Sequence, residues 1–221
     1  MSTRHTDTTS LAWPHWLLRF AASDDPDAFE QLIWSVGGSP PYGGVSQKEA
    51  SAVYELLEDY HGPGMASAVA YAKVAKFLKD PKTRRALELF RIRDRIASAP
   101  EDVSPEDVNE GLRLATELSH RGCHAYFQLL AAQLFHQRGD IAAARQYALT
   151  ALTTFAALSL EDRAYMGQML KAAVNATSFS AMEGEFAAAR QTLGLVEAYG
   201  DDVLEHYRVQ NTVTELRSML G

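Results

Sequence analysis

The sequence predicts an all-α protein, and three observations support this prediction. Alanine is abundant, whereas the 14 glycines and 8 prolines cluster at a few places, and this composition favours helix over sheet. Apolar residues recur at helical spacing along most of the 221 residues. No segment alternates apolar and polar residues, or concentrates β-branched residues, as a strand does. The length suits one large domain or a domain with a subdomain.

The N-terminal part of the chain divides into a polar tail and a helical subdomain. We expect residues 1–10, MSTRHTDTTS, to form a disordered tail and residues 11–80 to form the subdomain. The loop GGSPPYGG, residues 37–44, is the strongest break in the chain. The helices expected on either side of this loop cover residues 13–22, 26–36, 46–60 and 65–78.

Residues 81–221 are expected to form a regular series of helices joined by short links. The links include GD at 139–140 and GE at 184–185. Because short links place consecutive helices side by side, neighbouring helices are expected to run antiparallel. The expected helices cover residues 82–98, 105–120, 123–138, 141–157, 162–183, 186–199 and 202–220.

One stretch of this region occurs twice, 45 residues apart, as RGDIAAARQ (138–146) and EGEFAAARQ (183–191). In each copy a glycine follows one helix, because glycine readily adopts the left-handed conformation that ends many helices. The acidic residue after it suits the positive N-terminal end of the next helix. The three alanines allow two helix backbones to approach closely. The repetition therefore predicts two stacked helical hairpins.

The sequence GDIAAARQYALTAL, residues 139–152, resembles the tetratricopeptide repeat (TPR), a helical hairpin with a Gly-Asp-like turn. Ala144 and Ala151 stand at the small positions of that family, and Ala132 and Phe135 match its first helix. The resemblance implies a TPR-like antiparallel array of helical hairpins, an α-solenoid, that follows the N-terminal subdomain and ends in a capping helix.

The second copy departs from the family's pattern. Val196 replaces the second alanine, and Thr177 and Ser180 stand at the marker positions of the first helix. The period of 45 residues is longer than the usual 34 of the family. Residues 82–120 are a candidate for a third, degenerate unit. An ordinary helical bundle with one duplicated hairpin is therefore the alternative fold.

The resemblance implies that the first helix of each hairpin lines a concave binding face. In the first unit the lining residues are Tyr126, Leu129, Gln133 and His136. In the second unit they are Lys171, Val174, Asn175, Ser178 and Met182.

Lys171 and Asn175 are one helical turn apart and resemble the Lys/Asn pair on the peptide-clamping helices of this family. The ammonium meets a carboxylate, and the amide offers a donor and an acceptor to a peptide backbone. The equivalent positions one repeat earlier are Tyr126 and Leu130, so a complete clamp is not visible. A second polar pair, Arg208 and Asn211, is expected on the final helix. The alternative is that Lys171 is a solvated lysine and Asn175 a satisfied polar residue between helices.

Charge is distributed unevenly along the chain. The net charge is −7, yet residues 73–95 hold nine basic and three acidic residues. One interpretation is that this basic stripe binds phosphate or an acidic partner. The other is that it pairs with the downstream EDVSPED segment or is simply solvated. An acidic protein with one basic stripe is not expected to bind nucleic acid over its whole surface. The stripe's candidate contact residues are Arg84, Arg85, Arg91 and Arg95.

The chain has one cysteine, Cys123, so an internal disulfide is impossible and a reducing, cytoplasmic location is expected. Cys123 lies in HRGCH, residues 120–124, and a zinc site there lacks a nearby fourth ligand. We interpret HRGCH as a helical corner. The sequence has no phosphate-binding loop, dinucleotide fingerprint, nucleophile elbow or zinc-protease helix, so no metal or cofactor is expected. No apolar stretch is long enough to cross a membrane.

These features together predict a non-catalytic protein- or peptide-binding adaptor, scaffold or regulatory subunit that docks a partner segment on the concave face. Self-association through the end faces of the array is compatible with this function. One alternative is a regulatory protein that contacts nucleic acid or an acidic partner through the basic stripe. The other is a small helical enzyme with its site between the N-terminal helices and the array. That site would use Trp13, Trp16, Trp34, Tyr42 and His61.

Overall fold

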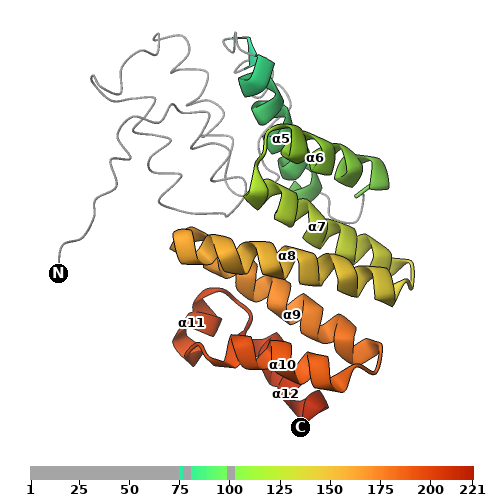
Figure 1. Cartoon of the computed structure of the whole chain (residues 1–221), viewed down its shortest axis with the longest axis vertical. Helices are drawn as coiled ribbons and strands as arrows, with labels where there is room; N and C mark the ends of the chain where they lie inside the picture. Colours follow the sequence, from blue (N-terminus) through green and yellow to red (C-terminus); the bar gives the residue numbers. More distant parts are fainter. Residues whose placement is uncertain (1–74, 77–80, 99–102) are drawn as a thin grey trace, which may run out of the picture. The chain divides into compact units, whose positions relative to one another are not determined.

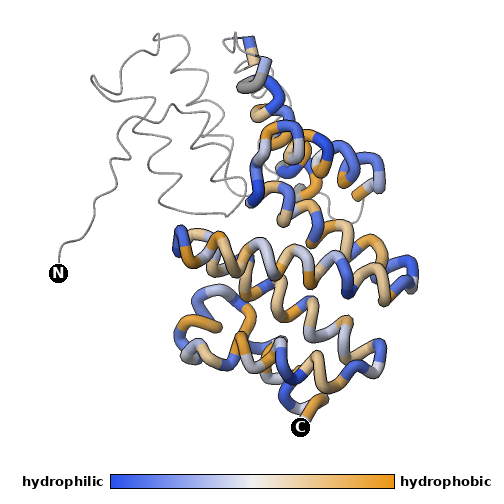
Figure 2. The backbone as a smooth tube through the Cα atoms, in the orientation of Figure 1, coloured by the Kyte–Doolittle hydropathy of each residue, from blue (hydrophilic) through white to orange (hydrophobic). Residues whose placement is uncertain are grey.

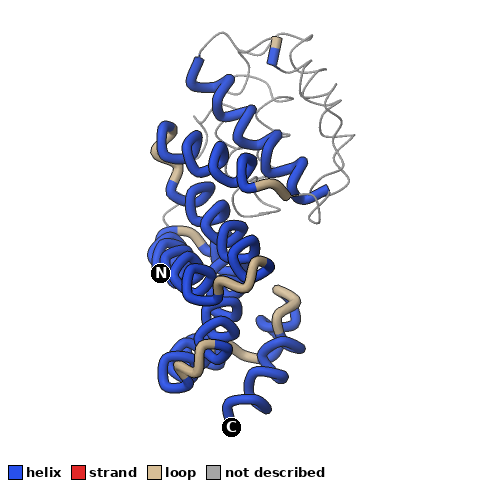
Figure 3. Tube along the Cα trace, turned by 90° about the vertical axis from the view of Figure 1, so that its right-hand side faces the viewer, coloured by secondary structure: helices blue, strands red, loops and turns tan. Residues whose placement is uncertain are grey.

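The computed structural model describes residues 75–76, 81–98 and 103–221 of the chain (Figure 1). Every regular element in these ranges is a helix, as Figure 3 shows, so the described part of the protein is all-α. The expected tail and nearly all of the expected N-terminal subdomain lie outside these ranges, as do the aromatic residues of the enzyme alternative. The described residues fall into two compact units.

The described part of the first unit contains helix α5 (Pro81–Ser98) and residues Arg113–Leu118, which include the end of helix α6 (Pro105–Glu117). Helix α5 is amphipathic, because its apolar residues fall on one face at helical spacing. The buried apolar residues of α5 are Ala86, Leu87, Leu89, Ile92 and Ile96.

The second unit contains residues Ser104–Leu112, which include the first part of α6, and the whole chain from Ser119 onward. Consecutive helices pack on one another from α7 to α10, and α12 packs on both α9 and α10. Figure 1 shows α8 and α10 in front of α9 and α12, so successive helices alternate between two layers. The elements after α6 are α7 (Arg121–Gln137), α8 (Ile141–Glu161), the 3₁₀ turn η3 (Arg163–Tyr165), α9 (Met166–Met182), α10 (Phe186–Glu197), α11 (Asp201–His206) and α12 (Gln210–Leu220).

The duplicated stretch forms the turns between α7 and α8 and between α9 and α10, which are hydrophilic in Figure 2. Gly139 and Gly184 both have a φ of 80°, so the prediction of a left-handed glycine at each turn is confirmed. Asp140 caps α8, because its carboxylate accepts a hydrogen bond from the Ala143 amide at 3.0 Å. The equivalent Glu185 makes no such capping bond.

The alanine triplets contribute less to packing than the sequence suggested. Only the third alanine of each triplet, Ala144 and Ala189, is fully buried. The first two alanines of each triplet are exposed or half-buried. Close approach of helix backbones therefore depends on one alanine in each copy.

The arginine that follows each triplet makes a contact across the two layers. Arg145 Nε lies 2.5 Å from Glu183 Oε2, directly after the end of α9. Arg190 Nε donates a hydrogen bond of 2.9 Å to the carbonyl of Leu220, the last residue of α12. The two copies of the stretch thus have the same structural role, since each arginine holds the C-terminal end of a helix in the other layer.

Two glycines provide a second recurrent contact. Gly122 and Gly167 are each the second residue of their helices, α7 and α9. A Cβ atom at Gly122 would lie 2.7 Å from the Tyr165 ring, and one at Gly167 would lie 2.7 Å from the Tyr207 ring. Gly122 at the start of α7 therefore makes room for Tyr165, which directly precedes α9. Gly167 at the start of α9 makes room for Tyr207, which lies in the turn before α12. Neither contact was predicted from the sequence.

The expected single helix over residues 202–220 is wrong. The chain forms two helices, α11 and α12, and Arg208 between them has a φ of 59°. No glycine or proline lies in this turn to signal the break. The break places the Tyr207 ring against Gly167, a contact between distant parts of the chain that local sequence does not encode.

Candidate functional site

Helix α9 is buried on every side except along one narrow stripe. Every residue from Gly167 to Ala181 is buried except Lys171, Asn175 and Ser178. Met182, which ends the helix, is exposed. Residues spaced by four, three and four positions share one side of a helix. We call this set the α9 stripe; it consists of Lys171, Asn175, Ser178 and Met182.

The burial of α9 follows from its place between α8, α10 and α12, all of which pack on it. Ala172, Ala173 and Ala176 are fully buried, so neighbouring helices approach closely. The buried hydroxyl of Thr177 donates a hydrogen bond of 2.9 Å to the Ala173 carbonyl, which satisfies it within the helix. The surrounding helices therefore hold the α9 stripe rigidly.

The polar groups of the stripe have no partner inside the described part of the protein. The Lys171 side chain is exposed and makes no ion pair with any described residue. Asn175 is half-buried, and its amide makes no hydrogen bond to a described residue. The exposed Lys171 fits the solvated lysine of the alternative interpretation, whereas no hydrogen-bond partner for the Asn175 amide lies among the described residues.

The other end of the stripe is apolar. The Met182 side chain is 57% exposed. Three residues earlier, the buried Phe179 ring lies 5.1 Å from the His136 ring of α7, measured between centroids. His136 itself is exposed. The last turns of α7 and α9 therefore contact each other through the His136 and Phe179 rings.

The remaining residues expected on α7 differ in exposure. Gln133 is exposed, whereas Tyr126 is half-buried with its ring 5.5 Å from Phe127 in an edge-on contact. The prediction that Leu129 and Val174 line the surface is wrong, because both side chains turn into the core. Spacing alone did not separate these two positions from the exposed stripe.

The expected second polar pair does not share one helix. Arg208 is exposed in the turn between α11 and α12, while Asn211 is exposed in the first turn of α12. The break at Tyr207–Val209 separates them. The structure therefore does not place Arg208 and Asn211 on a common helix face.

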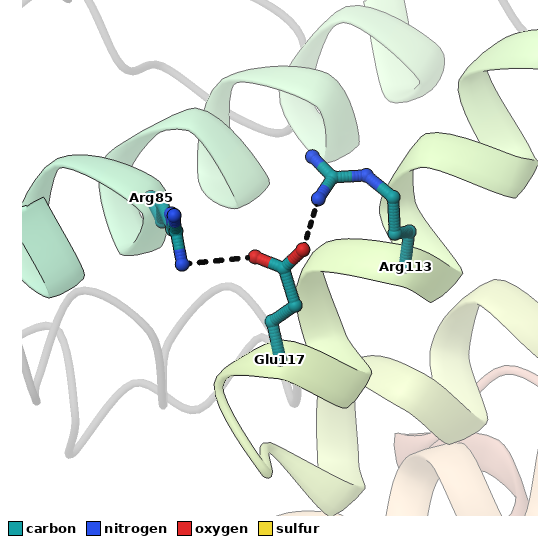
Figure 4. Close-up of polar contacts among 3 residues, drawn as sticks. All are labelled: Arg85, Arg113 and Glu117. Carbon is teal, nitrogen blue, oxygen red and sulfur yellow. Dashed lines mark hydrogen bonds and ion pairs between the residues drawn. The ribbon is translucent and has the colours of Figure 1, made fainter.

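Two arginines of the basic stripe pair with acids inside the first unit. Arg85 Nη1 on α5 lies 3.1 Å from Glu117 Oε2. Figure 4 shows that the Glu117 carboxylate pairs with both Arg85 and Arg113. Arg91 Nε donates a hydrogen bond of 2.9 Å to Glu88 on its own helix. Arg85 and Arg91 thus pair with Glu117 and Glu88, neither of which belongs to the EDVSPED segment named in the sequence prediction. Arg84 and Arg95 are both exposed.

The HRGCH segment begins helix α7. His120 is the N-cap residue, and its Nδ1 accepts a hydrogen bond of 3.1 Å from the Cys123 amide. Cys123 is buried. Within the described ranges, no three His, Cys, Asp or Glu residues gather as they would around a metal ion. The interpretation of this segment as a helical corner is confirmed.

Acid is expected to destabilise the beginning of α7. Burial lowers the pKa of His124 from its ordinary value of 6.5, so the unfolded chain binds a proton more readily than the folded one. The free energy of unfolding should therefore fall as the pH drops below about 6.5. Urea denaturation between pH 8 and pH 5, followed by circular dichroism, measures this dependence. His124→Gln should flatten it, and an unchanged slope would contradict the assignment.

Comparison with protein-family models, curated proteins and solved structures finds no match to this chain. Among the described helices, none has the length and apolar character needed to span a membrane.

Proposed function

We propose that this protein is a non-catalytic adaptor, scaffold or regulatory subunit whose helices form a TPR-like array and which docks a segment of a partner protein on the α9 stripe. The observation that carries the proposal is the stripe itself. It is the sole accessible side of the Gly167–Ala181 segment, and its ammonium and amide groups have no partner among the described residues. A rigid surface with unsatisfied polar groups suits recognition of an extended segment.

The recurrent contacts support an array over an irregular bundle. The arginine of each duplicated stretch holds the end of a helix in the other layer. A tyrosine from each following unit packs against a glycine at the start of α7 or α9. Units that contact only their neighbours through repeated interactions are typical of solenoid proteins.

Docking would use two kinds of interaction along α9. The Lys171 ammonium would pair with a carboxylate of the partner, and the Asn175 amide would donate to and accept from its backbone. Because both groups lie on a helix packed by α8, α10 and α12, little ordering of the protein would accompany binding.

The nucleic-acid alternative has weaker support. Two of the four arginines proposed for it, Arg85 and Arg91, already pair with Glu117 and Glu88. A basic surface that contacts phosphate needs its guanidinium groups available.

The adaptor proposal is tested by retention of proteins from a source lysate on the immobilised full-length chain. We expect a specific partner to bind the wild type and to be lost from Lys171→Glu/Asn175→Ala. A matched control, Gln146→Ala/Gln191→Glu, changes exposed residues of α8 and α10 in the other layer and should retain the partner. A specific partner that binds all three proteins equally would show that the α9 stripe is not the binding face.

A further inference from the structure

We propose that two copies of this chain associate through the exposed side of helices α8 and α10. These two helices form one layer of the second unit, and α7, α9 and α12 form the other (Figure 1). This contact is separate from the proposed docking site, because the α9 stripe lies in the other layer. We call the exposed side of α8 and α10 the outer face; its principal residues are Gln146, Thr150, Thr153, Leu160, Gln191 and Leu195.

The outer face carries no charge, because every charged side chain of α8 and α10 contacts the other layer. The two helices contain four charged residues, and their partners lie on α7, on α12 or directly after α9. The four contacts are Arg145–Glu183, Glu161–Arg121, Arg190–Leu220 (backbone carbonyl) and Glu197–Arg217. The solvent side of a surface helix is normally charged and polar. The outer face therefore lacks the charges that usually accompany exposure to water.

The side chains of the outer face are suited to burial. The hydroxyls of Thr150 and Thr153 each donate a hydrogen bond to the carbonyl four residues earlier, at 2.8 Å and 2.9 Å. Covering this surface therefore leaves neither hydroxyl donor without a partner. Leu160 is 90% exposed and Leu195 is 53% exposed, so a covering surface would remove apolar area from water.

The charge of the chain favours a second copy as the molecule that covers the outer face. The chain carries a net charge of −7, so two copies repel each other where carboxylates are exposed, for example at Asp201 and Asp202 of α11. A two-fold contact places the same surface on both copies, and the outer face brings no like charges together. Depletion of charge is also typical of the core of protein interfaces. A strongly acidic or basic partner, by contrast, would find no charge on this face to pair with.

The size of the outer face sets the expected strength of the contact. Residues 142–160 of α8 span about 27 Å at 1.5 Å per residue, and two neighbouring helices are roughly 20 Å wide. A face-to-face contact would therefore bury about 500 Å² on each copy, or about 1,000 Å² in total, which is at the lower end for specific interfaces. We therefore expect a reversible dimer that dissociates at roughly micromolar concentration.

Sedimentation equilibrium of the full-length chain, from low to high micromolar concentration, tests the inference. We expect the mean mass of the wild type to rise with concentration towards twice that of one chain. Thr153→Glu should weaken self-association by about tenfold or more, because it places a carboxylate in the middle of the face on both copies. Thr214→Glu is the matched control, since Thr214 is exposed on α12 and also donates its hydroxyl to the carbonyl four residues earlier. Circular dichroism checks that each variant is folded.

A mixture of oppositely charged variants tests whether the same face of both copies forms the contact. Thr153→Lys alone should also weaken self-association, but an equimolar mixture of Thr153→Glu and Thr153→Lys should form mixed dimers, because opposite charges then meet across the two-fold axis. A wild-type chain that stays monomeric at every concentration would overturn the inference. Equal loss of self-association in Thr214→Glu, or no mixed dimer from the two variants, would also overturn it. All of these outcomes leave the test of the α9 stripe unaffected, because that test measures retention of a partner.

Discussion

Replacing Phe155 with alanine is expected to lower the free energy of unfolding of the second unit by about 3–5 kcal/mol. The Phe155 side chain on α8 is fully buried, with its ring centroid 6.2 Å from that of Tyr165. Removing the ring takes away its apolar burial and leaves a cavity that the packed helices fill only in part. Among single substitutions in this unit, the effect should be one of the largest.

Urea denaturation followed by circular dichroism at the helical band measures this loss. Thr153→Ala is the control on the same helix, because Thr153 is exposed and bonds only to the Leu149 carbonyl one turn earlier. The control should change the free energy of unfolding by less than about 0.5 kcal/mol. Similar stability of the two variants would mean that Phe155 does not occupy the core.

Gly111→Ala is expected to destabilise the second unit by about 1–3 kcal/mol, although alanine is normally the better helix former. A Cβ atom at Gly111 on α6 would lie 2.2 Å from the ring of Phe127 on α7. Because the Phe127 side chain is fully buried, its ring has no free space into which to move. The clash therefore outweighs the gain in helix propensity.

Gly194→Ala provides the opposite result with the same chemical change. Gly194 lies inside α10, and a Cβ atom there would have no neighbour within 4 Å. This substitution should stabilise the protein by roughly 0.5–1 kcal/mol. Thermal and urea unfolding of the two variants should thus shift in opposite directions. A stabilising Gly111→Ala would contradict the close approach of α6 and Phe127.

The turns of the duplicated stretch were predictable because they depend on local chemistry. A left-handed glycine and an acidic residue at the start of the next helix are encoded within a few residues, and Gly139, Asp140 and Gly184 lie as expected. The all-α class followed from composition and periodicity for the same reason.

The break between α11 and α12 was not predictable in this way. Val209, Val213 and Leu216 follow helical spacing, and no glycine or proline within residues 202–220 marks the end of a helix. The turn at Arg208 accompanies the packing of Tyr207 on Gly167, forty residues earlier in the chain. Contacts of this kind are set by tertiary structure and override local propensity.

The candidate site was predictable only in part. Helical spacing grouped Lys171, Asn175, Ser178 and Met182 correctly on one exposed side of α9. The same spacing also included Val174, which is buried because three neighbouring helices leave α9 so little accessible surface. The width of an exposed stripe depends on how many elements pack around a helix, and sequence periodicity does not report that number.

The two arginine contacts differ in how mutation can break them. At Glu183 the acceptor is a side chain, so one substitution at either Arg145 or Glu183 removes the ion pair. At Leu220 the acceptor is a backbone carbonyl, which every amino acid supplies. The two equivalent contacts therefore differ in their sensitivity to substitution. A side-chain substitution at either Arg145 or Glu183 removes the ion pair, whereas the hydrogen bond to the Leu220 carbonyl is removed only by a substitution at Arg190.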